Sequence, residues 1–511
     1  MNDARLVEVL HGSTRHGETP THPERLVSFR PLDPANRPRP FKSYPDLEPA
    51  RLPRTIARSS IPAAEVLSGR RGQARGLDDE LLGTLLFLAA GVTRFTAGGL
   101  GGDDRVWFRT AMSAGNLHPV EVYLVRSGVH HYDPLDHALV PLRDRGEVPD
   151  QGPGATVILS GIPFRTGWKY GERGWRHLWW DAGSMLANLL AAAAAHGLEA
   201  QVMTAFPDDA VSQLVGIDGL EEMPLVVVEL GDSAFAVPPA GSLRALTASS
   251  LPIASRVLRF PLVEEAQSAG VLDEDGVGTW RAAAPTASRP APLEVEPPLG
   301  ASADQRIEDV ILERGSTRVF RTERAASQLL EWSMPAAARA VPFDAAPAGT
   351  LIEHLVNVHD VEGAEAGGYR YTNDGGFEGR VRIADVRAAG AGLCLGQPLG
   401  GDSAYTVFHA AGLDALFGSL GARGYRAAQL EAGVASGRLA LNAFALGVGA
   451  TGLTFYDGLV SRYFRTDASP LLATAIGVPD TSPAPSGTPG HPAELRGYGN
   501  VMSRLAARLA R

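Results

Sequence analysis

Lysine is nearly absent from this chain: of its 47 Lys and Arg residues, only Lys42 and Lys169 are lysine. Lys169 is followed directly by Tyr170. An arginine stays protonated at any working pH, whereas a buried lysine can lose its proton, so only the lysine can serve as a base. A single lysine is more often an ordinary surface cation. The adjacent phenol makes Lys169 and Tyr170 our candidate pair for proton transfer, and Lys42 receives no chemical role.

A second candidate group is a cluster of cations. Arg314 and Arg318 stand four residues apart in Arg-Gly-Ser-Thr-Arg, with Ser316 between them. Two guanidinium forks can pair the oxygens of a phosphate dianion, and the serine hydroxyl adds a neutral hydrogen bond. Two arginines at this spacing are also typical of a solvated helix face. Phosphate binding is therefore a hypothesis that needs support from other motifs.

Two small-residue segments offer that support. The first consists of Ser113, Ala114, Gly115 and Asn116, just before an apolar run. Its Ser and Asn side chains could contact the edge of a heteroaromatic ligand, although a plain loop would have the same composition. The second lies after a long Ala-rich stretch and is expected to be a turn whose backbone amides approach a flat or anionic ligand. The alternative is a simple helix cap by Gly447. The residues of this turn are Gly449, Ala450, Thr451 and Gly452.

Composition excludes several kinds of protein. The net charge is −10 without a basic stripe, which argues against nucleic-acid binding. The single Cys394 cannot form an internal disulfide or a Cys-rich metal site, and its apolar neighbours predict a buried thiol. We assign no metal, because no histidine pair has helical spacing backed by a carboxylate. Without a signal core or an apolar membrane span, we expect a cytoplasmic protein that does not bind membranes.

The elements that position these residues occur twice. Arg-Gly-Trp-Arg at 173–176 is echoed by Arg-Gly-Tyr-Arg at 423–426, an offset of 250 residues. Arg-Gly-Gln-Ala-Arg at 71–75 is echoed by Arg-Gly-Ser-Thr-Arg at 314–318, an offset of 243 residues. Two echoes in the same order at nearly one offset indicate a tandem duplication.

Each copy is expected to contain a first helix, a strand pair, a long Ala-rich helix and a final strand, which together make an α+β fold with a mostly antiparallel sheet. A Pro-rich and Ala-rich stretch between the copies reads as a semi-rigid linker. The expected divisions are an N-terminal extension (1–60), domain 1 (61–245), the linker region (246–302), domain 2 (303–480) and a Pro-rich tail with a short helix (481–511).

These motifs carry a family resemblance. The Arg-x-Ser-x-Arg cluster, the Ser-Ala-Gly-Asn loop and the Gly-rich segment resemble the FMN-binding elements of the nitroreductase-like flavoproteins. More narrowly, residues 38–45 and the Trp-Lys-Tyr at 168–170 are similar to segments of the azoline dehydrogenases, which oxidise thiazolines and oxazolines in modified peptides. The resemblance extends from about Leu10 to Pro479.

The resemblance implies that two nitroreductase-like units pair and that each FMN site lies between them. In this chain the units would form an intramolecular pseudo-dimer. Copy 2 keeps the serine of the Arg cluster, and copy 1 keeps the Ser-Asn loop and the Lys-Tyr pair. One composite FMN site is therefore expected, and the second, around Arg71 and Arg75, is expected to be degenerate.

The implied activity is a two-electron oxidation of an azoline or a related peptide-derived substrate, with proton abstraction, hydride transfer to FMN and reoxidation by oxygen. An NAD(P)H-dependent nitroreductase or flavin reductase would use the same site without a base. A non-catalytic scaffold or peptide-binding subunit is a third reading. The expected partners are a peptide or small-molecule substrate and other enzymes of a peptide-modifying complex, and further homo-oligomerisation stays open.

Overall fold

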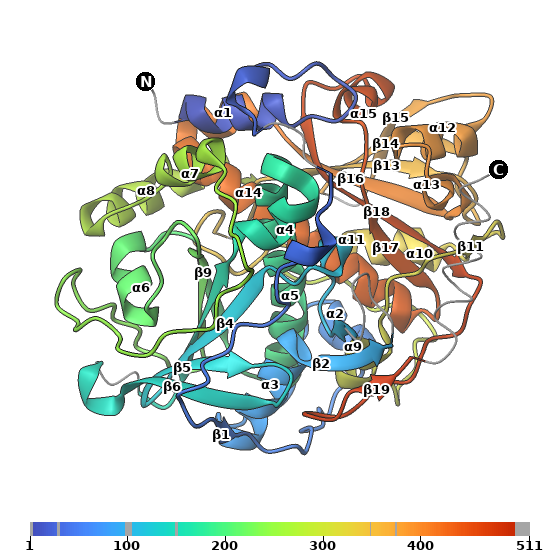
Figure 1. Ribbon diagram of the computed structural model, residues 1–511. Coiled ribbons are helices and arrows are strands. Elements are labelled where there is room, and N and C mark those ends of the chain that lie inside the picture. Colours follow the sequence, from blue (N-terminus) through green and yellow to red (C-terminus); the bar gives the residue numbers. More distant parts are fainter. Residues whose placement is uncertain are drawn as a thin grey trace.

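The computed structural model describes residues 4–27, 31–97, 105–148, 152–347, 349–373 and 376–495. Two antiparallel sheets flank a central pair of long helices, α5 (Gly174–Ala195) and α14 (Leu413–Ala445) (Figure 1). We call residues 61–245 the first half and residues 303–480 the second half. The expected α+β class is confirmed, since helices surround sheets that are antiparallel.

The first sheet has seven strands in the order β1-β6-β5-β4-β7-β9-β8, and all its pairings are antiparallel. Its central strand β4 and the neighbouring β7 are buried along their whole lengths. The strands are β1 (Ala50–Arg51), β4 (Val120–Val125), β5 (Gly128–Asp133), β6 (Ala138–Asp144), β7 (Ala155–Gly161), β8 (Ala200–Met203) and β9 (Met223–Leu230).

The second sheet has the order β11-β18-β16-β13-β14-β15, and β17 also pairs with β18. Its strands are β11 (Phe320–Arg321), β13 (Glu353–Val358), β14 (Gly367–Tyr371), β15 (Phe377–Val381), β16 (Tyr405–Ala411), β17 (Gly449–Leu453) and β18 (Ser469–Pro479). The order β6-β5-β4-β7-β9-β8 in the first sheet therefore corresponds to the order β15-β14-β13-β16-β18-β17 in the second sheet.

The helical segments also correspond. In the first half α4 (Pro163–Tyr170) is separated from α5 by Gly171, which has φ 55° and ψ −143°. In the second half α14 runs through a kink at Gly421, which has φ 58° and ψ −154°. The two glycines are 250 residues apart and adopt nearly the same left-handed backbone, which side chains disfavour. The sequence echo thus coincides with a shared local geometry.

Helices α5 and α14 pack against each other at glycines. A Cβ atom on Gly183 would lie 2.6 Å from the Cα of Gly433, and one on Gly437 would lie 2.5 Å from the Cβ of Ala187. Gly433 and Gly437 lie 250 residues after Gly183 and Ala187. The small residues let the two backbones approach closely, which a larger side chain would prevent.

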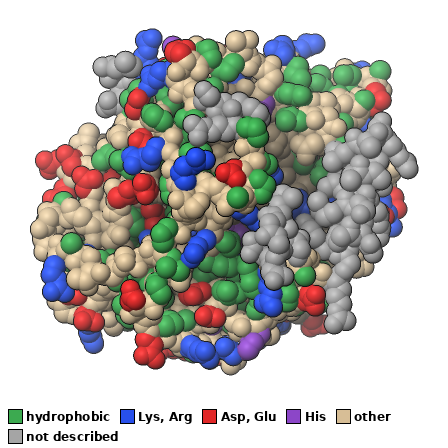
Figure 2. Space-filling view, viewed as in Figure 1, with side chains coloured by type: hydrophobic (Ala, Val, Ile, Leu, Met, Phe, Trp, Pro, Cys, Tyr) green, Lys and Arg blue, Asp and Glu red, His purple; other side chains and the backbone are tan. Residues whose placement is uncertain are grey.

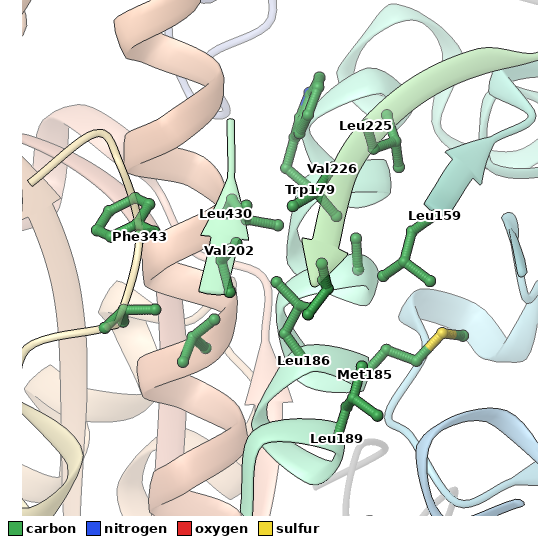
Figure 3. Close-up of a cluster of buried hydrophobic side chains, with 14 of the residues drawn as sticks. Leu159, Trp179, Met185, Leu186, Leu189, Val202, Leu225, Val226, Phe343 and Leu430 are labelled. Atoms are coloured by element: carbon green, nitrogen blue, oxygen red, sulfur yellow. The ribbon is translucent and has the colours of Figure 1, made fainter. Parts of the chain in front are cut away.

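The core lies between the first sheet and this helix pair. Figure 3 shows Leu159 of β7 and Val226 of β9 above Leu186 of α5, with Leu430 of α14 and Phe343 on the other side of the cluster. All five side chains are buried. Each contributes about 1.5–3 kcal/mol by leaving water. The two halves therefore share one apolar core.

The region expected to be a linker contains helices. α7 (Pro261–Ser268) and α8 (Glu274–Ala287) form there, and the indole of Trp280 is buried and donates to the carbonyl of Leu420 in α14. The prediction of a semi-rigid linker is wrong for this stretch, because α8 begins at an Asp273 cap and packs against α14 of the second half. Proline and alanine content alone did not reveal these tertiary contacts.

The segment after β18 is also more ordered than a tail. Residues 481–495 cross to the first half, where β19 (Ala493–Glu494) pairs in parallel with β2 (Val92–Thr96), which in turn pairs with β3 (Val106–Arg109). The short helix expected near Arg511 lies outside the described residues. The first helix expected in the second copy, over residues 325–332, is shorter than expected, since only Gln328–Glu331 is helical there (α10).

The remaining elements are shorter helices, strands and turns around the two sheets. They are α1 (Ala4–Ser13), α2 (Ala63–Leu67), α3 (Asp79–Ala90), α6 (Asp208–Val215), α9 (Ile307–Glu313), α11 (Ser333–Ala337), α12 (Val386–Leu393), α13 (Pro398–Asp402), α15 (Asp457–Phe464), β10 (Arg289–Pro290), β12 (Gly349–Thr350) and the 3₁₀ turns η1 (Pro23–Arg25), η2 (Pro34–Asn36), η3 (Ala114–Asn116), η4 (Arg145–Glu147) and η5 (Gly171–Arg173).

Surface and membrane properties follow from the same structure. Figure 2 shows Lys and Arg side chains scattered over one face of the molecule among acidic and neutral residues. Within the described part of the chain, no helix combines the length and apolar character needed to cross a membrane. Cys394 is buried as expected, and burial raises the pKa of its thiol to about 12.

Candidate functional site

A cavity of about 320 Å³ lies between the two halves. Ser113 and Asn116 of the first half line it, together with Arg314, Ser316 and Arg318 of the second half. The structure therefore brings together two motifs that are about 200 residues apart in the sequence and that were assigned to one site.

One end of the cavity is strongly cationic. Arg94 and Arg314 line it and are buried, with 6% and 4% of their surface exposed. Nε and Nη2 of Arg314 donate to the carbonyl of Thr110, and no carboxylate pairs with either arginine among the described residues. Burial and the charge of Arg94 lower the pKa of Arg314 to about 9, and burial lowers that of Arg94 to about 10. Two buried, uncompensated guanidiniums make this end suitable for an anion.

The rest of the Arg cluster is anchored to the second sheet. Ser316 forms a parallel bridge with Ala450, and the amide of Thr317 donates to the carbonyl of Ala450 over 3.0 Å. A Cβ on Gly449 would lie 2.1 Å from Oγ1 of Thr317, so this position must be glycine for the two segments to meet. Residues 449–450 of the glycine segment thus hold the backbone of the Arg cluster in place.

This arrangement corrects the expected turn. Gly449, Ala450 and Thr451 belong to strand β17, as does Gly452, and the turn lies earlier, at Gly447 with φ 72°. Gly447 and Val448 line the cavity, whereas residues 449–452 do not. The reason is that a left-handed Gly447 ends the helix, after which the chain extends and pairs with β18.

The Ser-Asn loop adopts a tight turn. Gly115 and Asn116 have positive φ angles of 61° and 57°. The amide of Ala114 donates to Oδ1 of Asp181 over 3.0 Å, and the side-chain amide of Asn116 donates to the carbonyl of Trp107 over 2.7 Å. Oγ of Ser113 accepts from the amide of His118. These bonds fix the loop at the cavity wall.

Lys169 and Tyr170 lie at the end of α4, next to this loop. The Lys169 ammonium is 5.3 Å from the ring centre of Tyr170, and a Cβ on Gly115 would lie 2.6 Å from the Tyr170 hydroxyl. Lys169 is exposed and Tyr170 is half-buried, and neither side chain belongs to the lining of the cavity. They therefore stand at its edge, beside Gly115.

Charge couples this pair to the Arg cluster. Partial desolvation and the positive charge of Arg318 lower the pKa of Lys169. Burial and the carboxylate of Asp181 raise the pKa of Tyr170 to about 12, although Arg318 opposes this. The Lys169 amine is therefore easier to deprotonate than an ordinary lysine, and the phenol stays protonated at neutral pH.

Three parts of the site were missed from the sequence. Asp181 accepts a hydrogen bond from the amide of Ala114 in the Ser-Asn loop, and burial raises the pKa of Asp181 to about 7. Arg94 lies in an ordinary-looking strand, and residues 481–484 form one wall of the cavity. Asp181 had a signal, because it belongs to the repeated segment that follows the Arg-Gly-Trp-Arg motif; the other two had none.

A smaller cavity of about 220 Å³ lies on the other side of the α5 and α14 pair, where the echoed Arg cluster stands. There Arg71 pairs with Glu199 over 2.8 Å and Arg75 pairs with Asp78 over 2.5 Å. The guanidinium of Arg339 donates to the carbonyl of Leu293, from the segment that joins the halves. The cations of this cavity are therefore already engaged by groups of the chain itself.

Comparisons with known proteins agree with this architecture. Residues 73–232 match the model described as "Nitroreductase family". "Putative nitroreductase MJ1384" of Methanocaldococcus jannaschii is 27% identical over 168 residues, which cover 29% of this chain and 78% of that protein. Both matches fall short of the whole chain.

Solved structures extend the likeness in fold. The crystal structure of a "putative nitroreductase" from Anabaena variabilis ATCC 29413 has a TM-score of 0.67 and 22% identity, and covers 93% of this chain and 99% of that chain. That likeness concerns the fold alone, and it includes both sheets. The E. coli microcin synthetase McbBCD complex with truncated pro-MccB17 bound has 22% identity, covers 45% of this chain and 92% of that chain, and its TM-score of 0.24 is too low to carry an argument.

Proposed function

We propose that this chain is an FMN-dependent oxidoreductase with one composite site between its two halves. The observation that carries the proposal is the cavity itself. It joins a buried pair of arginines, Arg94 and Arg314, to the hydrogen-bonding loop at Ser113 and Asn116. Neither arginine has a carboxylate partner in the part of the chain that the structure describes. A ligand that suits both ends has an anionic group at one end and a polar ring at the other.

The residues present fit FMN. Arg314, Ser316 and Arg318 would hold the phosphate, since forked guanidiniums and a hydroxyl match its oxygens. Ser113 and Asn116 would contact the polar edge of the ring system, with Ala114 and Gly115 shaping the turn. Gly449, Ala450, Thr451 and Gly452 would act indirectly, through the backbone of the Arg cluster. The cavity volume, about 320 Å³, is within the range of small-molecule sites.

We further propose that the halves are tandem nitroreductase-like copies that form an intramolecular pseudo-dimer. The same strand order in both sheets, the matching kinks at Gly171 and Gly421, and the contact of Gly183 with Gly433 support this. Positions related by the offset of 250 residues would meet where a two-fold axis passes between the helices. The pairing of Arg71 with Glu199 supports the proposal of one competent site.

The proposed reaction is the oxidation of an azoline, or a related peptide-derived ring, to its aromatic form. FMN held by these residues would supply the two-electron acceptor for the hydride, with molecular oxygen as the final oxidant. Lys169 takes the acidic ring proton on its neutral amine, which the charge of Arg318 helps to maintain. Tyr170 keeps its own proton and, as a neighbouring donor, orients the substrate at the cavity edge. The preference for azolines depends on the likeness of the Trp-Lys-Tyr segment.

A second candidate is an NAD(P)H-dependent nitroreductase, which the match of residues 73–232 favours. That reaction needs no base, so it would be indifferent to Lys169. Rapid bleaching of bound FMN by NAD(P)H in a Lys169→Arg variant would select it. We place the protein in the cytoplasm, with a peptide substrate delivered by other modifying enzymes; a scaffold role would require a chain that takes up no flavin.

The decisive experiment is the absorption spectrum of the purified full chain, with the flavin released by heat and quantified. We expect a yellow protein with one FMN per chain. Two FMN per chain would contradict the single-site proposal, and a chain that stays colourless after incubation with excess FMN would overturn the flavin proposal.

A further inference from the structure

Arg94 contacts two separate segments of the chain at the cationic end of the cavity. Its Nη2 donates to the carbonyls of Leu312, over 2.5 Å, and Ala484, over 2.9 Å. Its Nη1 donates to the carbonyl of Arg314 over 3.2 Å, and its Nε donates to the carbonyl of Pro485 over 3.1 Å. Its Nη2 also donates to the carbonyl of Glu313 over 3.5 Å. All five acceptors are backbone oxygens, so the guanidinium acts as a bridge between main-chain segments.

The first segment is the end of helix α9, from which the Arg cluster continues. Leu312 lies in the last turn of α9, whose carbonyls have no partner within the helix, and Arg314 is its C-cap residue. A cation at the C-terminus of a helix is favourable because the free carbonyls carry partial negative charge. Arg94 therefore holds the backbone at the start of the candidate phosphate-binding cluster.

The second segment, residues 481–495, we call the strap. Its first part lines the cavity, through Thr481 to Ala484, and it continues as an extended chain along β2. The amide of Gly487 donates to the carbonyl of Thr93 over 2.8 Å, and that of Leu495 to the carbonyl of Phe95 over 2.7 Å. Ser486 also donates to the carbonyl of Leu312. The strap thus closes one side of the cavity and is joined to both halves.

We propose that Arg94 is a positioning residue of the FMN site, which clamps the strap to the end of α9 and so controls release of the cofactor. This inference rests on the proposed function. Beyond its charge at the cationic end of the cavity, Arg94 acts on the site through the backbones of Arg314 and of the strap. Because its guanidinium contacts five carbonyls, replacing it would free the strap and loosen the start of the Arg cluster together.

The other half of the molecule contains a matched control. Arg339 donates from Nη2 to the carbonyl of Leu67, at the end of α2, and from Nη1 to the carbonyl of Leu293, in the segment that joins the halves. It is therefore a comparable bridge at the smaller cavity. Replacing it removes similar hydrogen bonds at a distance from the proposed FMN site.

The test compares the FMN complexes of the full-length wild type, Arg94→Ala, Arg94→Lys and Arg339→Ala. Each complex is mixed with an excess of a second, flavin-free protein that captures released FMN. The change in FMN fluorescence then gives the rate of release. We expect release from Arg94→Ala to be about tenfold faster or more, as the loss of charged hydrogen bonds implies. Arg339→Ala is expected to stay within about twofold of the wild type, where single-site changes away from the ligand commonly remain.

Arg94→Lys separates positioning from simple charge attraction. A lysine keeps the positive charge but cannot bridge the five carbonyls that Arg94 contacts, so we expect fast release, as with alanine. Wild-type release from Arg94→Lys would overturn the clamp, and so would equal acceleration in Arg94→Ala and Arg339→Ala.

Amide hydrogen exchange, measured without FMN, gives an independent readout. Arg94→Ala should speed exchange at Gly487 and Leu495, whereas Arg339→Ala should speed exchange at Val295, whose amide donates to the carbonyl of Ser68. Unchanged exchange in the strap of Arg94→Ala would refute the clamp even in a chain that takes up no flavin. A wild type without FMN but with the expected exchange pattern would instead refute only the proposed function.

Discussion

Asp457 of the second half forms an ion pair with Arg173 of the first half, with 3.1 Å between Oδ2 and Nη1. Arg176 reaches the other oxygen of the same carboxylate, also over 3.1 Å. A second ion pair has the acid in the first half and the arginine in the second, since Asp208 pairs with Arg423 over 2.6 Å. Because all these groups are buried, the halves are joined by reciprocal ion pairs in addition to their shared core.

Replacing Asp457 with Asn should weaken this connection and change its response to acid. Burial alone would raise the pKa of Asp457, but Arg173 and Arg176 lower it to about 2, from an ordinary value of 3.8. A lowered pKa stabilises the fold above pH 3.8, and that contribution is lost as the pH falls towards 2. At pH 7 the variant should lose about 3–5 kcal/mol, as expected for a broken buried pair.

Urea unfolding at pH 7 and at pH 3 measures this effect. The difference between wild type and Asp457→Asn should shrink at the lower pH. The exposed Asp414→Asn serves as control and should match the wild type at both pH values. An unchanged difference at both pH values would mean that the ion pair does not contribute as described.

Gly183→Ala should destabilise the packing of α5 on α14. The added Cβ would lie 2.4 Å from the carbonyl of Leu430 and 2.6 Å from the Cα of Gly433, so the helices must move apart. Overpacking of this kind costs about 1–3 kcal/mol. Gly418→Ala is the matched control on α14, because nothing lies within 4 Å of its added Cβ. Thermal unfolding should separate the two variants, and equal melting temperatures would contradict the close helix contact.

Arg314→Ala should lower the affinity for FMN far more than Arg71→Ala. The two residues occupy echoed positions, but Arg314 is buried at the larger cavity whereas Arg71 is paired with Glu199 at the surface. Loss of a charged phosphate contact costs about 1.5–3 kcal/mol, or about 10-fold to 100-fold in the dissociation constant. Quenching of flavin fluorescence measures both constants, and equal losses would contradict the single site.

Lys169→Arg should retain FMN and lose turnover, since a guanidinium cannot accept a proton at working pH. In the wild type, activity should rise with pH as Lys169 deprotonates, with a midpoint below the ordinary lysine value of about 10.4. In Arg318→Gln, saturated with FMN, the midpoint should move to higher pH because one positive neighbour is gone. Full activity in Lys169→Arg would exclude the base.

Glu431→Gln should increase stability relative to wild type as the pH rises above about 4.5. Burial raises the pKa of Glu431 from 4.5 to about 7, so the fold favours the protonated form. The wild type therefore loses stability as the pH rises from about 4.5 to 7, and a neutral Gln avoids this loss. The variant should gain up to about 3 kcal/mol relative to wild type between pH 5 and pH 8. Parallel stability curves for the two proteins would contradict the raised pKa.

Local pattern was enough for much of the architecture. Apolar periodicity located the strands and the long helices, and the echo at 250 residues coincides with the matched kinks at Gly171 and Gly421. These features depend on residues that are close together in the chain, so they can be predicted from the sequence alone. The expectation that one site joins the two halves came from the family resemblance, and the structure places its residues around one cavity; they are Arg314, Ser316, Arg318, Ser113 and Asn116.

The errors arose where distant residues decide the outcome. The segment 449–453 became a strand because β18 offers it a partner, and α8 formed because α14 covers Trp280. The strap received its place from β2 and Arg94, which lie almost 400 residues earlier in the chain. No local composition encodes such contacts.

The two lysines show the same division. The amino-acid sequence by itself determined that only Lys42 and Lys169 can supply a removable proton among the cations. Only the tertiary structure decided between them. It buries Lys42 against Glu222, over 2.7 Å, and Tyr123, over 2.9 Å, and the Glu222 carboxylate raises its pKa although burial alone would lower it. It leaves the Lys169 side chain at the cavity edge, where partial desolvation and the cation Arg318 from the other half lower its pKa.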